Sequence, residues 1–194
     1  MRMMNKDTIC AISTPRGQGG ISIIRMSGPE SIHIAERIFH PSQSTVLSTV
    51  PSHTVHYGHI IDGAQRLDEV LLTVFRKPRT YTTEDVVEIN AHGGLVVSKM
   101  ILDLLIKQGA RLAEPGEFTK RAFVNGRIDL AQAEAVLAMI TAKTARGAHT
   151  AAQLLHGCFS KEIHEIKQTV VSVSSILEAS LDFSEDVDDA DTAG

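Results

Sequence analysis

Residues 8–26, with the sequence TICAISTPRGQGGISIIRM, decide the fold class of this chain. The two apolar runs 8–13 and 21–26 are typical of buried strands. Between them, residues 14–20 form a segment rich in proline and glycine, which favours a turn. The stretch therefore predicts two β-strands joined as a hairpin or through a bulged loop.

Outward from this hairpin, strand and helix patterns are mixed up to about residue 115, and only helical patterns follow. This change predicts an α+β chain, with a mixed α/β domain at 1–118 and the first helices of an incomplete α-helical domain at 119–194. The last helical segment carries an apolar stripe, which predicts packing against partner helices. The further predicted strands are 54–61, 67–75, 86–90 and 110–113, and the predicted helices are 29–39, 95–107, 117–124, 130–143 and 146–181.

The composition is typical of a folded protein in a reducing compartment. Of the 194 residues, 43% are hydrophobic and 22% are charged, which is close to the average for soluble globular proteins, so a packed core is expected. The two cysteines, Cys10 and Cys158, have no metal-binding spacing, which argues against a disulfide framework and a zinc site. No apolar run reaches about 18 residues, so we expect a cytosolic protein without a membrane span.

The overall charge does not favour direct binding to nucleic acid. The net charge is −4, so any RNA contact would be local or made through another chain. The acidic residues gather at 182–191, a segment that we interpret as a solvated linker.

Two nucleotide-binding motifs are approached but not matched. The loop with Gly17 and Gly19 fails the GxGxxG pattern, because Ser22 stands at the last glycine position and a strand follows where a helix is required. The segment 93–99, GGLVVSK, resembles a phosphate loop but lacks the glycine before its lysine. We therefore expect no nucleotide hydrolysis by this chain alone.

Arg25 and Glu88 are charged residues in apolar strands. Alternation places Arg25 on the same face as Ile21 and Ile23, and Glu88 follows two valines. A buried guanidinium and a buried carboxylate both need partners. The two residues could neutralise each other as a structural ion pair. Alternatively, they line a pocket in which the carboxylate binds adjacent N–H donors of a heterocycle and the arginine binds ligand oxygens.

Three further polar residues lie at predicted turns. His92 precedes two glycines where a strand gives way to a helix, and we interpret it as the polar flank of a tight turn. Asp129 is placed to cap the helix that begins at Leu130. Arg127 beside the 125–127 turn is a solvated charge unless that turn closes over the pocket.

Taken together, these segments resemble the N-terminal half of the tRNA-modification GTPases, the MnmE/TrmE family. Any one match alone is weak, but many matches in the same order along almost the whole chain are specific. The matching segments are DTI at 7–9, TPRGQGG at 14–20, IRMSG at 24–28, YTTEDVVE at 81–88, HGG at 92–94, PGEFTKRAF at 115–123, NGRIDLAQAE at 125–134 and DF at 182–183.

The resemblance implies a tetrahydrofolate-binding domain similar in fold to folate-dependent aminomethyltransferases, and a homodimer. The ligand would be 5-formyl- or 5,10-methylene-tetrahydrofolate, supplying one carbon for modification of the wobble uridine (U34) of tRNA together with an FAD-containing MnmG/GidA-type partner. The folate contacts carry over to Arg25, Glu88 and Arg127. No catalytic or metal-binding residue carries over, because the family's GTP, Mg²⁺ and K⁺ sites and its cysteine motif would lie beyond Gly194.

Two positions depart from the family pattern. Thr83 stands where the family usually has glycine, and Arg127 stands where lysine is common, which changes the geometry of the charge. Two other functions stay open: a stand-alone aminomethyltransferase-like enzyme, and a purely structural dimerisation module in which Arg25 and Glu88 form an ion pair.

Overall fold

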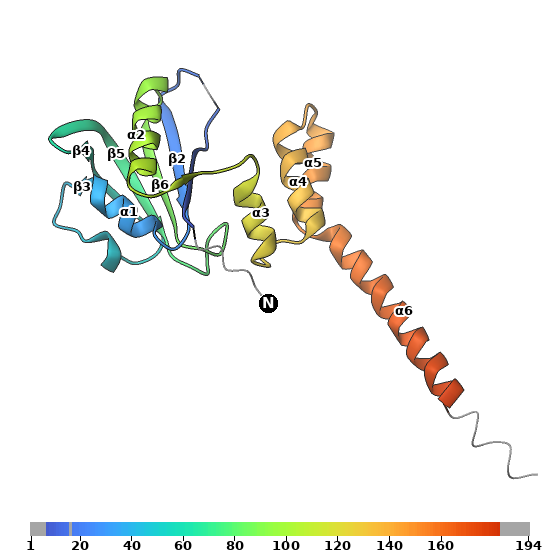
Figure 1. Cartoon of the computed structure of the whole chain (residues 1–194). Helices are drawn as coiled ribbons and strands as arrows, with labels where there is room; N and C mark the ends of the chain where they lie inside the picture. Colours follow the sequence, from blue (N-terminus) through green and yellow to red (C-terminus); the bar gives the residue numbers. More distant parts are fainter. Residues whose placement is uncertain (1–6, 16, 183–194) are drawn as a thin grey trace, which may run out of the picture. The chain divides into compact units, whose positions relative to one another are not determined.

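The computed structural model describes residues 7–15 and 17–182, and the chain divides into two compact units, 1–128 and 129–194. Figure 1 shows the elements of both in chain order. The break follows Ile128, whereas the sequence predicted a boundary after residue 118. Helix α3 (Glu117–Val124) follows the last strand but belongs to the first unit. The reason is its buried Arg121, which donates hydrogen bonds to Asp7 and Glu84.

The first unit is built on a seven-stranded sheet in the order β3-β4-β5-β6-β2-β1-β7. Neighbouring strands are antiparallel, except that β1 and β7 are parallel. With helices on this sheet and in the second unit, the α+β class is confirmed. The strands are β1 (Ile9–Ile12), β2 (Ile21–Ser27), β3 (Phe39–Pro41), β4 (Thr54–Asp62), β5 (Gln65–Phe75), β6 (Val86–His92) and β7 (Arg111–Leu112).

The predicted hairpin of residues 8–26 is confirmed, with Cys10 of β1 opposite Met26 of β2. Its glycine-rich loop is tied to the end of β6. The Gly19 N–H donates to the Gly93 carbonyl oxygen at 3.0 Å, and the Gly93 N–H donates to the Gly20 carbonyl oxygen at 3.3 Å. A Cβ atom on Gly93 would lie 2.3 Å from the Gly19 oxygen. Glycine is therefore required at 93 by this close approach of two backbone segments.

Helices α1 (Ser31–Ile38) and α2 (Leu95–Lys107) pack on one face of the sheet (Figure 1) and form the core with it. Both are close to their predicted spans, because each buries residues at helical spacing. Strand β3 and the short 3₁₀ helix η1 (Leu47–Thr49) were not predicted. Each has only three residues, which is too short for a periodic pattern.

The opposite face of the sheet exposes apolar side chains. Ile21 is 67% exposed, Val55 59%, Tyr57 50% and Leu71 48%. Arg25 lies on this face, in step with Ile21 as alternation predicted, but the face is not the core. The Arg25 side chain is 29% exposed, so its interpretation as a buried guanidinium is wrong. The residues of β2 that alternate with Arg25 face the core, and they include the buried Ile24 and Met26.

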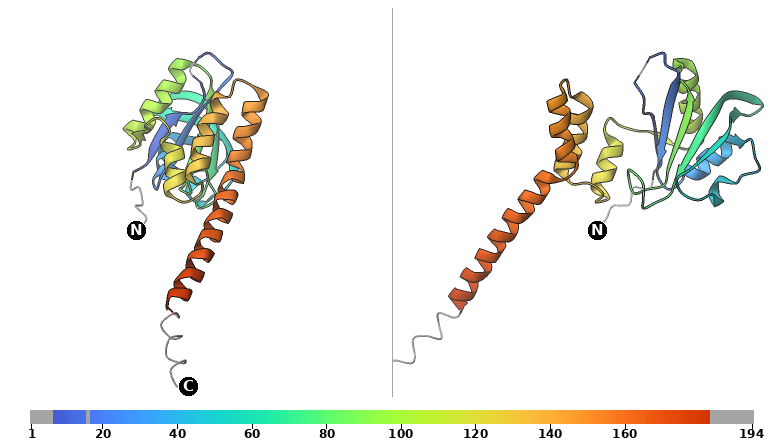
Figure 2. Two further views of the ribbon diagram at one scale, coloured as in Figure 1. Left: turned by 90° about the vertical axis from the view of Figure 1, so that its right-hand side faces the viewer. Right: turned by 180° about the vertical axis from the view of Figure 1, so that it is seen from behind.

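The second unit contains α4 (Leu130–Thr141), α5 (Ala145–Leu155) and α6 (Cys158–Asp182), and Figure 2 shows α4 and α5 side by side. Asp129 caps α4 as predicted, because its side chain accepts from the Gln132 N–H at 2.9 Å. The single long segment predicted for 146–181 is two helices. The chain breaks at Gly157, whose φ of +79° leaves the right-handed helical region.

The apolar stripe predicted for the last helix lies on α6 and is exposed. Among its members, Ile163 is 48% exposed, Ile166 61% and Ile176 66%. The acidic segment interpreted as a linker lies, from residue 183 on, outside the described residues. Within 7–15 and 17–182, no helix has both the length and the apolar character needed to cross a bilayer.

Candidate functional site

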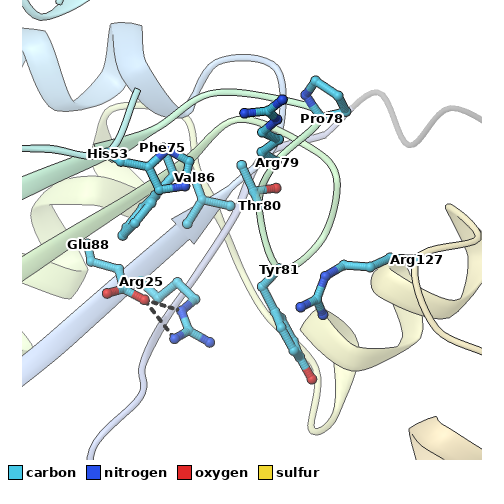
Figure 3. Close-up of a pocket in the computed structure, with 10 residues that line it drawn as sticks. All are labelled: Arg25, His53, Phe75, Pro78, Arg79, Thr80, Tyr81, Val86, Glu88 and Arg127. Carbon is cyan, nitrogen blue, oxygen red and sulfur yellow. Dashed lines mark hydrogen bonds and ion pairs between the residues drawn. The ribbon is translucent and has the colours of Figure 1, made fainter. Parts of the chain in front are cut away.

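A pocket of about 480 Å³ opens beside the uncovered face of the sheet in the first unit. This volume is within the range of small-molecule sites. Figure 3 shows its lining, which combines charged side chains with aromatic and aliphatic ones. The lining residues come from β2, β5, β6, the loop between β5 and β6 and the turn after α3, with His53 from the segment before β4: Arg25, His53, Phe75, Pro78, Arg79, Thr80, Tyr81, Val86, Glu88 and Arg127.

Arg25 and Glu88 form an ion pair across two strands. They lie opposite each other in the β2–β6 register, which places their side chains on the same face. The Arg25 Nε donates to Glu88 Oε1 at 2.7 Å, and Arg25 Nη2 lies 2.6 Å from the same oxygen. Both contacts use Oε1, so Glu88 Oε2 has no hydrogen-bond partner among the described residues. This carboxylate can still accept a hydrogen bond from a ligand.

Tyr81 forms an aromatic wall between two arginines. The Arg25 guanidinium carbon lies 5.7 Å from the ring centroid of Tyr81, and that of Arg127 lies 5.0 Å from it. These are cation–π distances. The Tyr81 hydroxyl and the Thr119 hydroxyl of α3 are 2.9 Å apart, which fixes the ring against α3.

Arg127 reaches the pocket because the turn after α3 is attached to the β5–β6 loop. The Asn125 Nδ2 donates to the Thr82 carbonyl oxygen at 2.7 Å. Arg127 therefore lines the pocket with Arg25 and Glu88. The structure brings the three predicted site residues to one place.

Sequence reasoning missed other residues of the lining. Arg79 has no hydrogen bond or ion pair in the described part of the chain, and no pattern in the sequence marked it. His53 packs edge-on against Phe75, with ring centroids 5.3 Å apart. Tyr81 is the first residue of the segment 81–88, one of the segments that resemble the family. That resemblance was the one feature of the sequence that could have pointed to Tyr81.

A buried network centred on Arg121 supports the β5–β6 loop. The side chain of Arg121 is 1% exposed. It donates to both oxygens of Glu84 at 3.2 Å, to Asp7 Oδ1 at 2.9 Å and to Glu117 Oε1 at 3.1 Å. Glu84 also accepts from the Ser27 hydroxyl at 2.7 Å. The loop that carries Tyr81 is thus anchored to β2, α3 and the N-terminal segment.

Two carboxylates of this network, those of Glu117 and Asp7, have pKa values below their ordinary range. Hydrogen bonds from Arg111 lower the pKa of Glu117 to about 2, against the opposing effect of burial. Burial alone would raise the pKa of Asp7, but its bonds to Arg111 and Arg121 outweigh this, and the pKa lies below its ordinary value. These charges are structural, because none of the four residues lines the pocket.

His92 lies outside the lining of the pocket. Its Nδ1 is 2.6 Å from Asp68 Oδ1, and its backbone N–H donates to Asp68 Oδ2 at 2.8 Å. It stands at the end of β6 beside the glycines that contact the hairpin loop. Within the described residues, no group of three or more histidine, cysteine, aspartate or glutamate side chains is placed to hold a metal ion.

Comparison with known proteins gives two family matches that together span most of the chain. The family described as GTP-binding protein TrmE N-terminus matches residues 8–127, and the MnmE helical domain matches residues 130–194. The division between the two matches falls where the structure divides into its two units.

Relatives named tRNA modification GTPase MnmE are about half identical to this chain. The protein of Listeria innocua is 54% identical over 182 residues, which is 94% of this chain and 39% of the relative. That of Geobacillus thermodenitrificans is 52% identical over 94% of this chain and 40% of the relative. That of Bacillus subtilis is 49% identical over 92% of this chain and 39% of the relative.

The fold and the matches define an N-terminal region with a ligand-sized pocket, joined to helices of a second domain. This chain belongs to the family of tRNA modification GTPases of the MnmE/TrmE type. It spans about 40% of the length of the relatives it matches.

Proposed function

We propose that this chain is the folate-binding and dimerising part of an enzyme that modifies the wobble uridine (U34) of tRNA. The pocket binds 5-formyl- or 5,10-methylene-tetrahydrofolate, which supplies one carbon. Glu88 accepts hydrogen bonds from the pterin edge, and Arg25 and Arg127 bind carbonyl or carboxylate oxygens of the ligand. The first unit then shares its fold with folate-dependent aminomethyltransferases.

One observation carries this proposal: the carboxylate of Glu88 is paired through one oxygen only. Its side chain is 19% exposed and lines the pocket, so the second oxygen is available to a ligand. A pterin presents adjacent N–H donors along one ring edge, and a carboxylate is the acceptor that matches such a pair. The rings of Tyr81 and Phe75 supply apolar walls for a flat heterocycle.

GTP hydrolysis belongs to the part of the relatives that lies outside the matched region, and with it Mg²⁺ and K⁺. The working enzyme acts in the cytosol with an FAD-containing MnmG/GidA-type partner and with tRNA as its substrate. Two copies of the chain pair through the exposed apolar face of the sheet, where Ile21, Val55 and Tyr57 are each at least half exposed. Burying these side chains favours association.

The ion pair also supports a second hypothesis, a purely structural dimerisation module. In that case Arg25 and Glu88 only join β2 to β6. This hypothesis predicts a folded dimer that binds no folate. A stand-alone aminomethyltransferase-like enzyme has less support, since Glu88, the one carboxylate among the described residues that line the pocket, is already engaged with Arg25.

Calorimetric titration with 5-formyltetrahydrofolate separates these hypotheses. We expect saturable binding by the wild type and roughly 10- to 100-fold weaker binding by Glu88→Gln, because a charge-assisted hydrogen bond is lost. Glu162→Gln, an exposed change on α6, is the matched control and keeps the wild-type affinity. A folded wild-type dimer that binds no folate would refute the proposed function and leave the structural module.

A further inference from the structure

The side chains that line the pocket carry more positive than negative charge. Among the described residues, three arginines, Arg25, Arg79 and Arg127, and one carboxylate, Glu88, line it. The charge of Arg25 is met by Glu88 at 2.6 Å. Within the described residues, the side chain of Arg127 has only its contact with the ring of Tyr81, and the side chain of Arg79 has no polar partner. The lining therefore has a formal excess of two positive charges.

These two arginines differ from the others of their unit. Every other described arginine of the first unit donates a hydrogen bond to a carboxylate or a backbone carbonyl of the chain. These are Arg25, Arg37, Arg66, Arg76, Arg111 and Arg121. Arg79 and Arg127, whose side chains donate none within the described residues, both line the same pocket. Unpaired guanidinium groups that converge on one cavity match an anionic ligand.

The backbone on both sides of Arg79 is held in place while its side chain stays exposed. The Thr80 hydroxyl donates to the Glu84 carbonyl oxygen at 2.6 Å, and the Thr80 N–H donates to the Pro78 carbonyl oxygen at 3.0 Å. The Lys77 N–H donates to Asp85 Oδ1 at 2.8 Å. The loop thus presents Arg79 from a fixed base, which reduces the entropy lost when its guanidinium binds a ligand.

Arg79 lies where it would contact the end of the ligand that is farthest from Glu88. In Figure 3, Arg79 lies on the opposite side of the pocket from the Arg25–Glu88 pair. A heterocycle whose ring edge binds Glu88 can extend its tail across the pocket toward Arg79. The tail of a folate is p-aminobenzoyl-glutamate, and each further γ-glutamyl residue adds one carboxylate, so in this orientation the anionic end of the ligand lies toward Arg79.

We propose that Arg79 is a further ligand-binding residue, and that the pocket prefers folates with a poly-γ-glutamyl tail because Arg79 binds tail carboxylates. This inference rests on the proposed function, since it takes the ligand to be a folate. Arg79 is exposed, so its contribution is that of a solvated ion pair, about fivefold in affinity at low salt.

The test is a calorimetric titration of the 194-residue chain with 5-formyltetrahydrofolate as the monoglutamate and as the triglutamate. The wild type is expected to bind the triglutamate about fivefold more tightly at low salt and to lose this preference as salt is added. Arg79→Gln is expected to lose most of the preference. The control Arg37→Gln removes the same charge from α1, which packs on the other face of the sheet, and keeps it.

The outcomes distinguish this inference from the function on which it rests. If the wild type binds both ligands equally, or if Arg79→Gln keeps the triglutamate preference, the inference is overturned while folate binding stands. If Arg37→Gln loses the preference as well, general charge and not Arg79 sets it, and the inference is again overturned. If the wild type binds neither ligand, the proposed function itself fails.

Discussion

Thr83 is held in a backbone conformation that opposes its side chain. Its φ is +61°, the left-handed region that a β-branched residue rarely adopts. The conformation costs roughly 1–2 kcal/mol for an L-residue with a Cβ atom. No hydrogen bond of the Thr83 side chain offsets this cost within the described residues. Glycine at this position removes the strain. It also increases the conformational entropy of the unfolded chain, which lowers the free energy of unfolding by up to about 1 kcal/mol.

We therefore predict that Thr83→Gly raises the free energy of unfolding by about 0.5–1 kcal/mol, which corresponds to a Tm increase of about 1–4 °C. Urea and thermal unfolding followed by circular dichroism measure both quantities. Thr83→Ala is the matched control, because it removes the branch and the hydroxyl but keeps the Cβ atom. A stability decrease in Thr83→Gly, or an equal increase in Thr83→Ala, would refute strain at this turn.

Three further predictions follow from single contacts. The pKa of Glu117 is lowered to about 2, so the charged carboxylate stabilises the fold at pH values above its unfolded pKa of about 4.3. This contribution of roughly 2–3 kcal/mol is lost as the pH falls toward 2. Glu117→Gln should therefore flatten the acid side of the curve of unfolding free energy against pH, and an unchanged curve would contradict the lowered pKa. Gly93→Ala places a Cβ 2.3 Å from a backbone oxygen and should lower stability by about 1–3 kcal/mol, whereas Gly94→Ala, with its nearest contact at 3.9 Å, should be close to neutral in the same urea titration. Burial raises the pKa of the Cys10 thiol to about 11, whereas Cys158 is exposed. A thiol reagent at pH 8 should therefore label only Cys158 of the two in the native chain, which mass spectrometry of the peptides would show. Rapid labelling of Cys10 would contradict its burial.

The longer elements could be predicted from sequence because their apolar residues repeat over several turns or pleats. Strands β4, β5 and β6 and helix α2 are of this kind. Strand β3 could not be predicted, because its three residues owe their conformation to pairing with β4. The break at Gly157 was missed because alanine-rich and apolar helical spacing continues on both sides of it.

The site was predictable where the residues conflict with their surroundings. Arg25 and Glu88 are charges in apolar strands, and this conflict is visible in the sequence itself. Their burial was overestimated, because alternation tells which residues share a face but not which face is covered. Arg79 and Arg121 gave no such signal: each is an arginine in a polar segment, and only tertiary contacts show that Arg121 is buried and that Arg79 is unpaired within the described residues.

The central claim is that the pocket beside the Arg25–Glu88 pair holds the pterin of a tetrahydrofolate. The most direct measurement is a crystal structure of the chain grown with 5-formyltetrahydrofolate. The claim predicts a ligand in the pocket whose ring N–H groups lie within hydrogen-bond distance of the Glu88 carboxylate, with Arg127 on its anionic or carbonyl oxygens. Folate bound elsewhere on the chain, with Glu88 contacting only Arg25, would contradict it.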